Sequence, residues 1–189
     1  MLLIGNGCVI TREPNNPMIE SGCVAIEADR IVEIGDTTML RGKYPGVTFV
    51  DAAGGLIMPG LTNTHMHFYS SFARGMDLKA QSPQEFGQIL ERLWWRLDKV
   101  LTSEDVYYSA AVAMLDCIRN GVTTVFDHHA SPGCVEGSLF QVADAAKELG
   151  LRTCLCYEVS DRDGEAVAAQ GIAENAAYIR DCQQANDPM

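Results

Sequence analysis

The chain has 189 residues and a formal net charge of −11, and no cluster of Lys and Arg offers the phosphate-neutralising surface that a nucleic-acid partner needs. Its seven cysteines are odd in number and scattered, without a Cys-x-x-Cys pair, which argues against a disulfide framework and indicates a reducing, cytoplasmic compartment. No segment approaches the ~20 apolar residues of a membrane span, and residues 1–5 do not resemble a secretion signal, so no membrane partner is expected.

The first 55 residues have the pattern of short β-strands. A Gly5-Asn6-Gly7 segment separates the first two apolar runs and is typical of a turn. Ala28-Asp29 separates two further runs, as in a β-hairpin. The expected strands are residues 2–4, 8–10, 23–27, 30–34 and 46–51. Such a set cannot bury both of its faces by itself.

From residue 56 onward, strand and helix patterns alternate, which predicts a parallel sheet. Thr102 can cap a helix that stops at Asn120-Gly121. The expected strands are residues 56–65, 122–127 and 152–159, and the expected helices are residues 85–100, 102–120, 138–149 and 164–182. These elements make three βα units.

Two histidines, His65 and His67, end the first of these strands. Residues i and i+2 of a strand point to the same face, so both imidazoles can reach one metal ion. A His-x-His pair on its own is often an incidental surface or turn feature. Here an apolar run and the Pro59-Gly60 break precede the pair, which favours a metal site.

The segment Val50–His67 resembles the entry into the catalytic barrel of the amidohydrolase superfamily. Further similarity to its cytosine deaminase and atrazine chlorohydrolase-like branch lies in residues 67–70, 93–98, 124–132 and 137–139. The resemblance implies an α/β fold in which residues 1–55 are strands of a composite β-sandwich. Residues 56–189 are then the first part of a metal-dependent (β/α)8 TIM barrel. Such a barrel takes ~250 residues, so we expect the N-terminal part of a longer enzyme, with a complete smaller fold as the alternative.

The resemblance also implies an activity. It indicates a hydrolase of carbon-nitrogen bonds other than peptide bonds, an aminohydrolase that releases ammonia from a small, nitrogen-rich heterocycle through a metal-activated water. The implied cofactor is one divalent ion, zinc with iron as the alternative, bound by His65, His67 and ligands from later strands. No catalytic residue is expected within this chain. The implied partners are the heterocyclic substrate and further copies of the full-length protein. Dechlorination, cyclic-amide opening and a non-catalytic fragment remain as alternatives.

Three residues are candidate substrate contacts: Tyr69, His128 and His129. The last two follow the second strand of the expected barrel, and strand ends carry the functional groups of such barrels. Neighbours in an extended segment point in opposite directions, so at most one of these histidines faces the barrel axis. Substrate contact, structural hydrogen bonding and metal ligation remain open for them. Tyr69 and Arg74 can line a pocket or belong to a solvated loop.

Two structural roles are considered for each of four other side chains. Trp94 and Trp95 suit a core or an interface better than a stacking platform for a ring. Cys154 and Cys156 can share one face of a strand, where thiols are more often core residues than metal ligands. Glu91 does not have the spacing to Trp94 that the resembled nucleoside-deaminating relatives use, which weighs against a nucleoside substrate.

Overall fold

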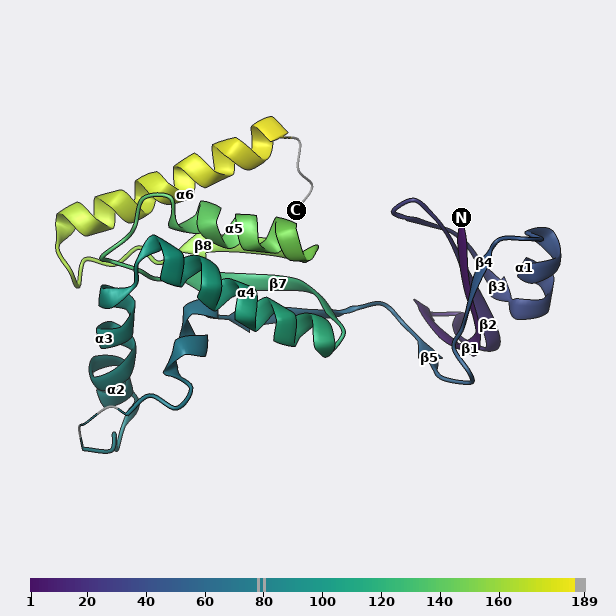
Figure 1. Cartoon of the computed structure of the whole chain (residues 1–189), viewed down its shortest axis with the longest axis horizontal. Helices are drawn as coiled ribbons and strands as arrows, with labels where there is room; N and C mark the ends of the chain where they lie inside the picture. The colour runs from purple at the N-terminus through teal and green to yellow at the C-terminus, as the bar shows by residue number, and fades with distance from the viewer. Residues whose placement is uncertain (78, 80, 186–189) are drawn as a thin grey trace. The chain divides into compact units, whose positions relative to one another are not determined.

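The chain is described by a computed structural model that covers residues 1–77, 79 and 81–185 (Figure 1). It divides into two compact units, Met1–Pro59 and Gly60–Met189, each of which has its own sheet. Among the described residues, no helix combines the length and the apolar character that a membrane crossing requires.

Alternating apolar residues in the first unit build a five-stranded sheet in the order β3-β2-β1-β4, with β5 also paired to β1. The β1–β2 and β2–β3 pairs are antiparallel, whereas β4 and β5 run parallel to β1. The elements are β1 (Leu2–Glu13), β2 (Asn16–Glu27), β3 (Arg30–Asp36), α1 (Thr37–Lys43), β4 (Thr48–Asp51) and β5 (Leu56–Ile57). The expected hairpin around Ala28-Asp29 and the expected strand before Asp51 are confirmed.

The expected turn at Gly5-Asn6-Gly7 is wrong. The chain instead continues as one strand, β1, with irregular pairing between Ile4 and Gly7. Asn6 takes a left-handed backbone conformation with φ of 56°. A Cβ atom at Gly7 would lie 2.6 Å from the carbonyl oxygen of Gly55, so a close approach of two backbones requires glycine there. A bulge and a turn share these residue types, and only the pairing partners distinguish them.

A short helix, α1, covers the first sheet and was not expected from the sequence. Its N-terminus is capped by the Asp36 carboxylate, which accepts hydrogen bonds from the backbone of Thr38 and Met39. Leu40 on this helix is completely buried against Leu3 and its neighbours. Seven residues give too few turns for a helical period to be recognised in the sequence.

The second unit contains a three-stranded parallel sheet in the order β6-β7-β8, as expected for consecutive βα units. Its strands are β6 (Leu61–Met66), β7 (Val122–His129) and β8 (Arg152–Tyr157), and its long helices are α4 (Ser103–Arg119), α5 (Ser138–Leu149) and α6 (Glu165–Ala185). The connection from β6 to α4 contains η1 (Phe68–Ala73), α2 (Phe86–Ile89), η2 (Leu90–Trp94), α3 (Trp95–Leu97) and η3 (Asp98–Val100). Of these short segments η2 is π-helical, while η1 and η3 are 3-10 helices.

The expected strand over residues 56–65 is divided in two by Pro59-Gly60. Leu56 and Ile57 form β5 in the first sheet, and β6 begins at Leu61. Proline has no backbone N–H to donate, so the ladder cannot continue through it. The expected helix start at Thr102 is confirmed by a complete capping box with Asp105.

The two faces of the second sheet differ in their cover. One face packs against the helices in a core that includes Val125, Met114 and Leu139, all of which are completely buried. The other face carries Phe126 and His128, which are exposed. Parallel pairing sets Met66 opposite Asp127, and His129 opposite Tyr157. The carboxyl ends of all three strands therefore meet at one edge, which positions the site.

Candidate metal and substrate site

The side chains of His65 and His67 lie next to one another at the carboxyl end of β6. Their ring centroids are 5.2 Å apart, with the ring planes almost perpendicular. His65 is exposed and His67 is half-buried, so both rings are accessible from the open face of the sheet. The backbone N–H of His65 donates to the side chain of Asn63 at 3.1 Å, which fixes this end of the strand. Two imidazoles so placed can direct one nitrogen each at a common ion.

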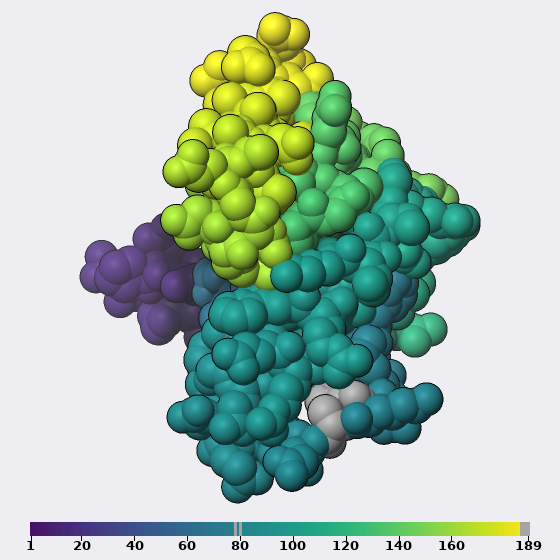
Figure 2. Space-filling model, turned by 90° about the vertical axis from the view of Figure 1, so that its left-hand side faces the viewer, coloured from purple at the N-terminus to yellow at the C-terminus, as the bar shows by residue number. Residues whose placement is uncertain are grey.

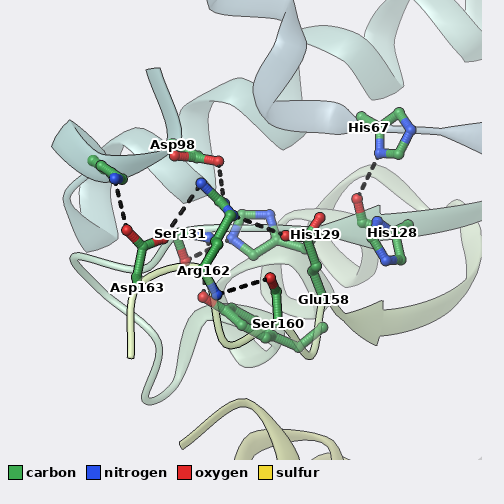
Figure 3. A network of polar contacts seen from close by, with 11 residues as sticks. His67, Asp98, His128, His129, Ser131, Glu158, Ser160, Arg162 and Asp163 are labelled. Atoms are coloured by element: carbon green, nitrogen blue, oxygen red, sulfur yellow. Dashed lines mark hydrogen bonds and ion pairs between the residues drawn. The ribbon is translucent and has the colours of Figure 1, made fainter. Parts of the chain in front are cut away.

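A backbone carbonyl sets the tautomer of His67. Its Nδ1 lies 2.8 Å from the carbonyl oxygen of His128, as Figure 3 shows. A carbonyl only accepts hydrogen bonds, so Nδ1 carries the hydrogen and Nε2 keeps its lone pair. Metal-binding histidines commonly donate their second N–H in this way, which fixes the ring and directs the free nitrogen to the ion.

Asp127 holds the loop that follows the histidine pair. Its Oδ1 accepts a hydrogen bond of 2.7 Å from the backbone N–H of Phe68. The Asp127 side chain is almost completely buried, and burial raises its pKa to about 7 against the smaller, opposite effect of that hydrogen bond. Its Oδ2 has no hydrogen-bond partner among the described residues. Asp127 thus ties the start of η1 to β7, directly behind the open face.

His128 and His129 point to opposite sides of β7, as strand geometry requires. The His128 ring lies on the open face, 5.5 Å from the ring of His67. His129 is completely buried on the helix side, where its Nε2 lies 3.0 Å from the hydroxyl of Ser131. Burial lowers the pKa of His129 to about 3, so the ring is neutral. Only His128 therefore faces the cavities in front of the sheet.

Tyr69 lies at the centre of a group of aromatic rings. Its ring meets His67, Trp94 and His129 edge to face, at centroid distances of 6.2, 6.1 and 5.8 Å. Burial raises the pKa of Tyr69, and the nearby carboxylate of Asp98 raises it further, so the phenol keeps its proton. Tyr69 is 6% exposed, and its ring connects the histidine pair to the helical wall of the site.

A cavity of about 410 Å³ opens in front of the histidine pair. It is lined by His65, His67, Tyr69, Phe86, Leu90, Trp94, Trp95, Asp98, His128 and Glu158. The π-helical segment η2 contributes Leu90 and Trp94 to this wall, and π-helical turns occur frequently at functional sites. Trp94 and Trp95 thus line the cavity, as a stacking platform requires, and Trp94 also packs against the core.

The remaining sequence candidates lie elsewhere. Arg74 forms an exposed ion pair of 2.9 Å with Asp116 and does not line this cavity. Glu91 is exposed and does not line this cavity. Cys154 and Cys156 line a second hollow of about 450 Å³ over the open face of the sheet, together with both metal-site histidines and His128. His129 lines neither space.

Sequence reasoning missed a charged cluster that contributes Asp98 and Glu158 to the lining of the cavity. The Arg162 guanidinium binds Asp98 at 2.5 Å and Glu158 at 3.3 Å. Burial raises the pKa of Asp98, and Arg162 opposes that rise. The signal was the charged run after the third barrel strand, at a strand end where barrels place functional groups. Asp98 gave no such signal, because it lies on a helix 64 positions away from its partner.

The histidine pair fits a metal ion only in part. No group of three or more His, Cys, Asp or Glu side chains that could hold an ion occurs within residues 1–77, 79 and 81–185. Catalytic zinc takes at least three protein ligands, and this pair supplies two with the appropriate chemistry. The free Nε2 of His67 and the adjacent ring of His65 are consistent with such a partial ligand set.

Comparison with known proteins identifies relatives over almost the whole chain. The amidohydrolase family matches residues 56–187, and the bacterial imidazolonepropionase-like composite domain matches residues 22–46. The 5'-deoxyadenosine deaminase of Methanosarcina barkeri is 30% identical over 98% of this chain and 40% of its own length.

Two solved structures show the same fold. An adenosine deaminase from Xanthomonas campestris with bound zinc superposes with a TM-score of 0.74 and 23% identity, over 99% of this chain and 40% of that one. The E241Q mutant of atrazine chlorohydrolase TrzN from Arthrobacter aurescens, complexed with zinc and atraton, gives a TM-score of 0.67 and 24% identity, over 82% of this chain and 35% of that one. This chain therefore spans about two fifths of the length of its relatives. Its mixed α/β fold corresponds to the N-terminal part of the barrel proteins in this family.

Proposed function

The chain belongs to the amidohydrolase family, and we propose from that premise that it provides the first part of the active site of a metal-dependent hydrolytic deaminase. The proposed substrate is a small, nitrogen-rich heterocycle. One observation carries this proposal: His65 and His67 lie together at a strand end, and the carbonyl of His128 leaves Nε2 of His67 free. This geometry suits a divalent ion, zinc with iron as the alternative.

The histidines of this chain would have distinct roles in the site. His65 and His67 would hold the ion through one nitrogen each, and the carbonyl of His128 would fix the ring of His67. When bound, a divalent ion supplies Lewis acidity that lowers the pKa of water toward neutrality, which makes hydroxide available for attack on an electrophilic ring carbon. The remaining ligands and the proton-transfer group would come from outside the described residues.

The side chains that line the cavity would position the heterocyclic ring of the substrate. Trp94 and Tyr69 offer aromatic surfaces to a planar heterocycle, and the ring of His128 offers a hydrogen-bonding nitrogen on the open face. We assign Tyr69 and His128 as substrate contacts. His129 would support them from behind, because it is completely buried and its ring contacts Tyr69.

Release of ammonia tests this proposal. The full-length protein that carries this chain should release ammonia from at least one member of a panel of aminated purines, pyrimidines and their nucleosides. A chelator should abolish the activity, and added zinc should restore it. The proposal of deamination fails if every aminated ring stays inert while a chlorinated triazine or a cyclic amide is hydrolysed.

A further inference from the structure

Glu158 lines the same cavity as the histidine pair, and its backbone is fixed. It directly follows β8, and its N–H donates to the carbonyl of His129 at 2.8 Å, which continues the ladder between β7 and β8. Successive residues of a strand alternate in direction. Tyr157 is buried on the helix side, so Glu158 turns toward the open face and lines the same cavity as His65.

Arg162 is shared among three carboxylates. Its Nη2 binds Asp98 Oδ2 at 2.5 Å, its Nε binds Glu158 Oε1 at 3.3 Å, and its Nη1 lies 3.3 Å from Asp163. Lys99 pairs with Asp163 at 2.6 Å and closes the cluster on the outer side. In Figure 3 the Glu158 carboxylate lies between Arg162 and the histidines His67 and His128. Figure 2 shows the yellow-green start of α6 directly above the teal part of the chain, which includes the short helices that line the cavity.

Polar atoms of both kinds lack hydrogen-bond partners in this cluster: an oxygen of Asp98 and, among the described residues, also Nη1 of Arg162. Asp98 is 1% exposed and lines the cavity, and its Oδ1 has no hydrogen-bond partner among the described residues. Glu158 places only Oε1 against Arg162 and is itself about one-third exposed. Buried carboxylate oxygens are normally satisfied by donors, and an unpaired one is costly. A ligand that brings N–H or O–H groups to these carboxylate oxygens would satisfy them.

We propose that Glu158, supported by Asp98, is a specificity-determining residue that accepts a hydrogen bond from a donor group of the substrate. The donor is a ring N–H or a sugar hydroxyl of the substrate. This inference rests on the proposed function and deepens it. The aromatic wall of Trp94 and Trp95 holds the ring, and Glu158 distinguishes rings that carry a donor from rings that lack one.

The test uses the full-length, metal-loaded protein and two matched pairs of probes. Adenine and 9-methyladenine differ in a ring N–H, and adenosine and 2',3'-dideoxyadenosine differ in sugar hydroxyls. Dissociation constants from calorimetry and KM values give the preference for the donor-bearing member of each pair. The wild type should prefer that member of at least one pair by about tenfold or more, the usual worth of a hydrogen bond to a charged group. The pair that shows the preference identifies the source of the donor.

Three variants separate recognition from structure. Glu158→Met removes the acceptor at similar length and should abolish the preference, and Glu158→Gln, which keeps one acceptor oxygen, should restore part of it. Asp163→Asn is the matched control, because Asp163 contacts the same guanidinium but does not line the cavity. It should keep the wild-type preference. Elemental analysis should show unchanged metal content in all three variants.

The outcomes are distinguishable. If Glu158→Met weakens the binding of both members of a pair equally, Glu158 only supports Arg162 and this inference is wrong. The same conclusion follows if Asp163→Asn loses the preference for the donor-bearing member as completely as Glu158→Met does. If the wild type discriminates within neither pair while still releasing ammonia, the inference fails and the proposed function survives. If the wild type neither binds nor deaminates any aminated ring, both fail.

Discussion

The two faces of β7 serve different purposes in one eight-residue strand. On the helix side Val125, Asp127 and His129 are buried, and packing against α4 and α5 completes their surroundings. On the open side Phe126 and His128 remain exposed beside the histidine pair. Burial in this strand is therefore concentrated on one face of the sheet, whereas the chemistry that we propose lies on the other.

Truncation of one large side chain on each side of the sheet, Leu139 of α5 and Phe126 of β7, tests this difference. Leu139→Ala should lower the free energy of unfolding by about 2–5 kcal/mol, because Leu139 is completely buried in the helix-side core and leaves a cavity. Phe126→Ala should cost far less in this chain, because Phe126 is 38% exposed. Urea unfolding of both variants measures the difference. Equal losses would mean that the open face contributes as much to stability as the covered one.

The pH dependence of stability tests the buried polar groups of the covered face. The folded-state pKa of Asp127 is raised to about 7, so its contribution to stability is fully present below pH 4 and is lost as the pH rises to about 7. The folded-state pKa of His129 is lowered to about 3, so its contribution is present above about pH 6.5 and is lost as the pH falls. Between pH 4 and 6.5 the two effects oppose each other.

The variant Asp127→Asn separates the pH effect of Asp127 from that of His129. Its amide oxygen can still accept the N–H of Phe68, but the amide side chain does not titrate. The stability of this variant relative to the wild type should rise between pH 4 and 7, on the order of 1 kcal/mol per pH unit. Denaturant unfolding at several pH values measures this difference. A constant difference over that range would show that Asp127 ionises normally in the folded chain.

A smaller effect is expected from a carboxylate that joins two helices on the covered side. Glu174 of α6 is 4% exposed, and its oxygens accept the N–H groups of Gly137 and Leu139, each at 2.9 Å. Glu174→Ala leaves these donors at the start of α5 without partners and should cost about 1–3 kcal/mol. Gln170→Ala, an exposed change on the same helix, is the control and should stay within about 0.5 kcal/mol of the wild type. Thermal unfolding of both distinguishes them.

Much of the second unit follows from local patterns in the sequence. Thr102, Asp105 and Asn120 delimit α4 because capping depends on residues within one turn. The His65-x-His67 pair was recognisable because strand geometry needs only the neighbouring residues. Opposite directions for His128 and His129 followed from the same rule.

What the sequence did not provide depends on contacts between distant segments. The Asp98–Arg162 ion pair joins residues 64 positions apart, and no local pattern specifies it. Continuation of β1 through Gly5-Asn6-Gly7 depends on pairing with three other strands, which the residue types alone do not reveal. The π-helical turn of Leu90–Trp94 likewise changes which side chains face the cavity without a signal in the apolar period.

The metal content of two histidine variants tests whether His65 and His67 form the metal pair. Elemental analysis of the purified full-length protein should show that His67→Ala loses most of its bound metal. His128→Ala should keep nearly all of it, because the contact from this residue to His67 is made by its backbone carbonyl, which the substitution leaves in place. Metal retained by His67→Ala and lost by His128→Ala would contradict the assignment of His65 and His67 as the metal pair.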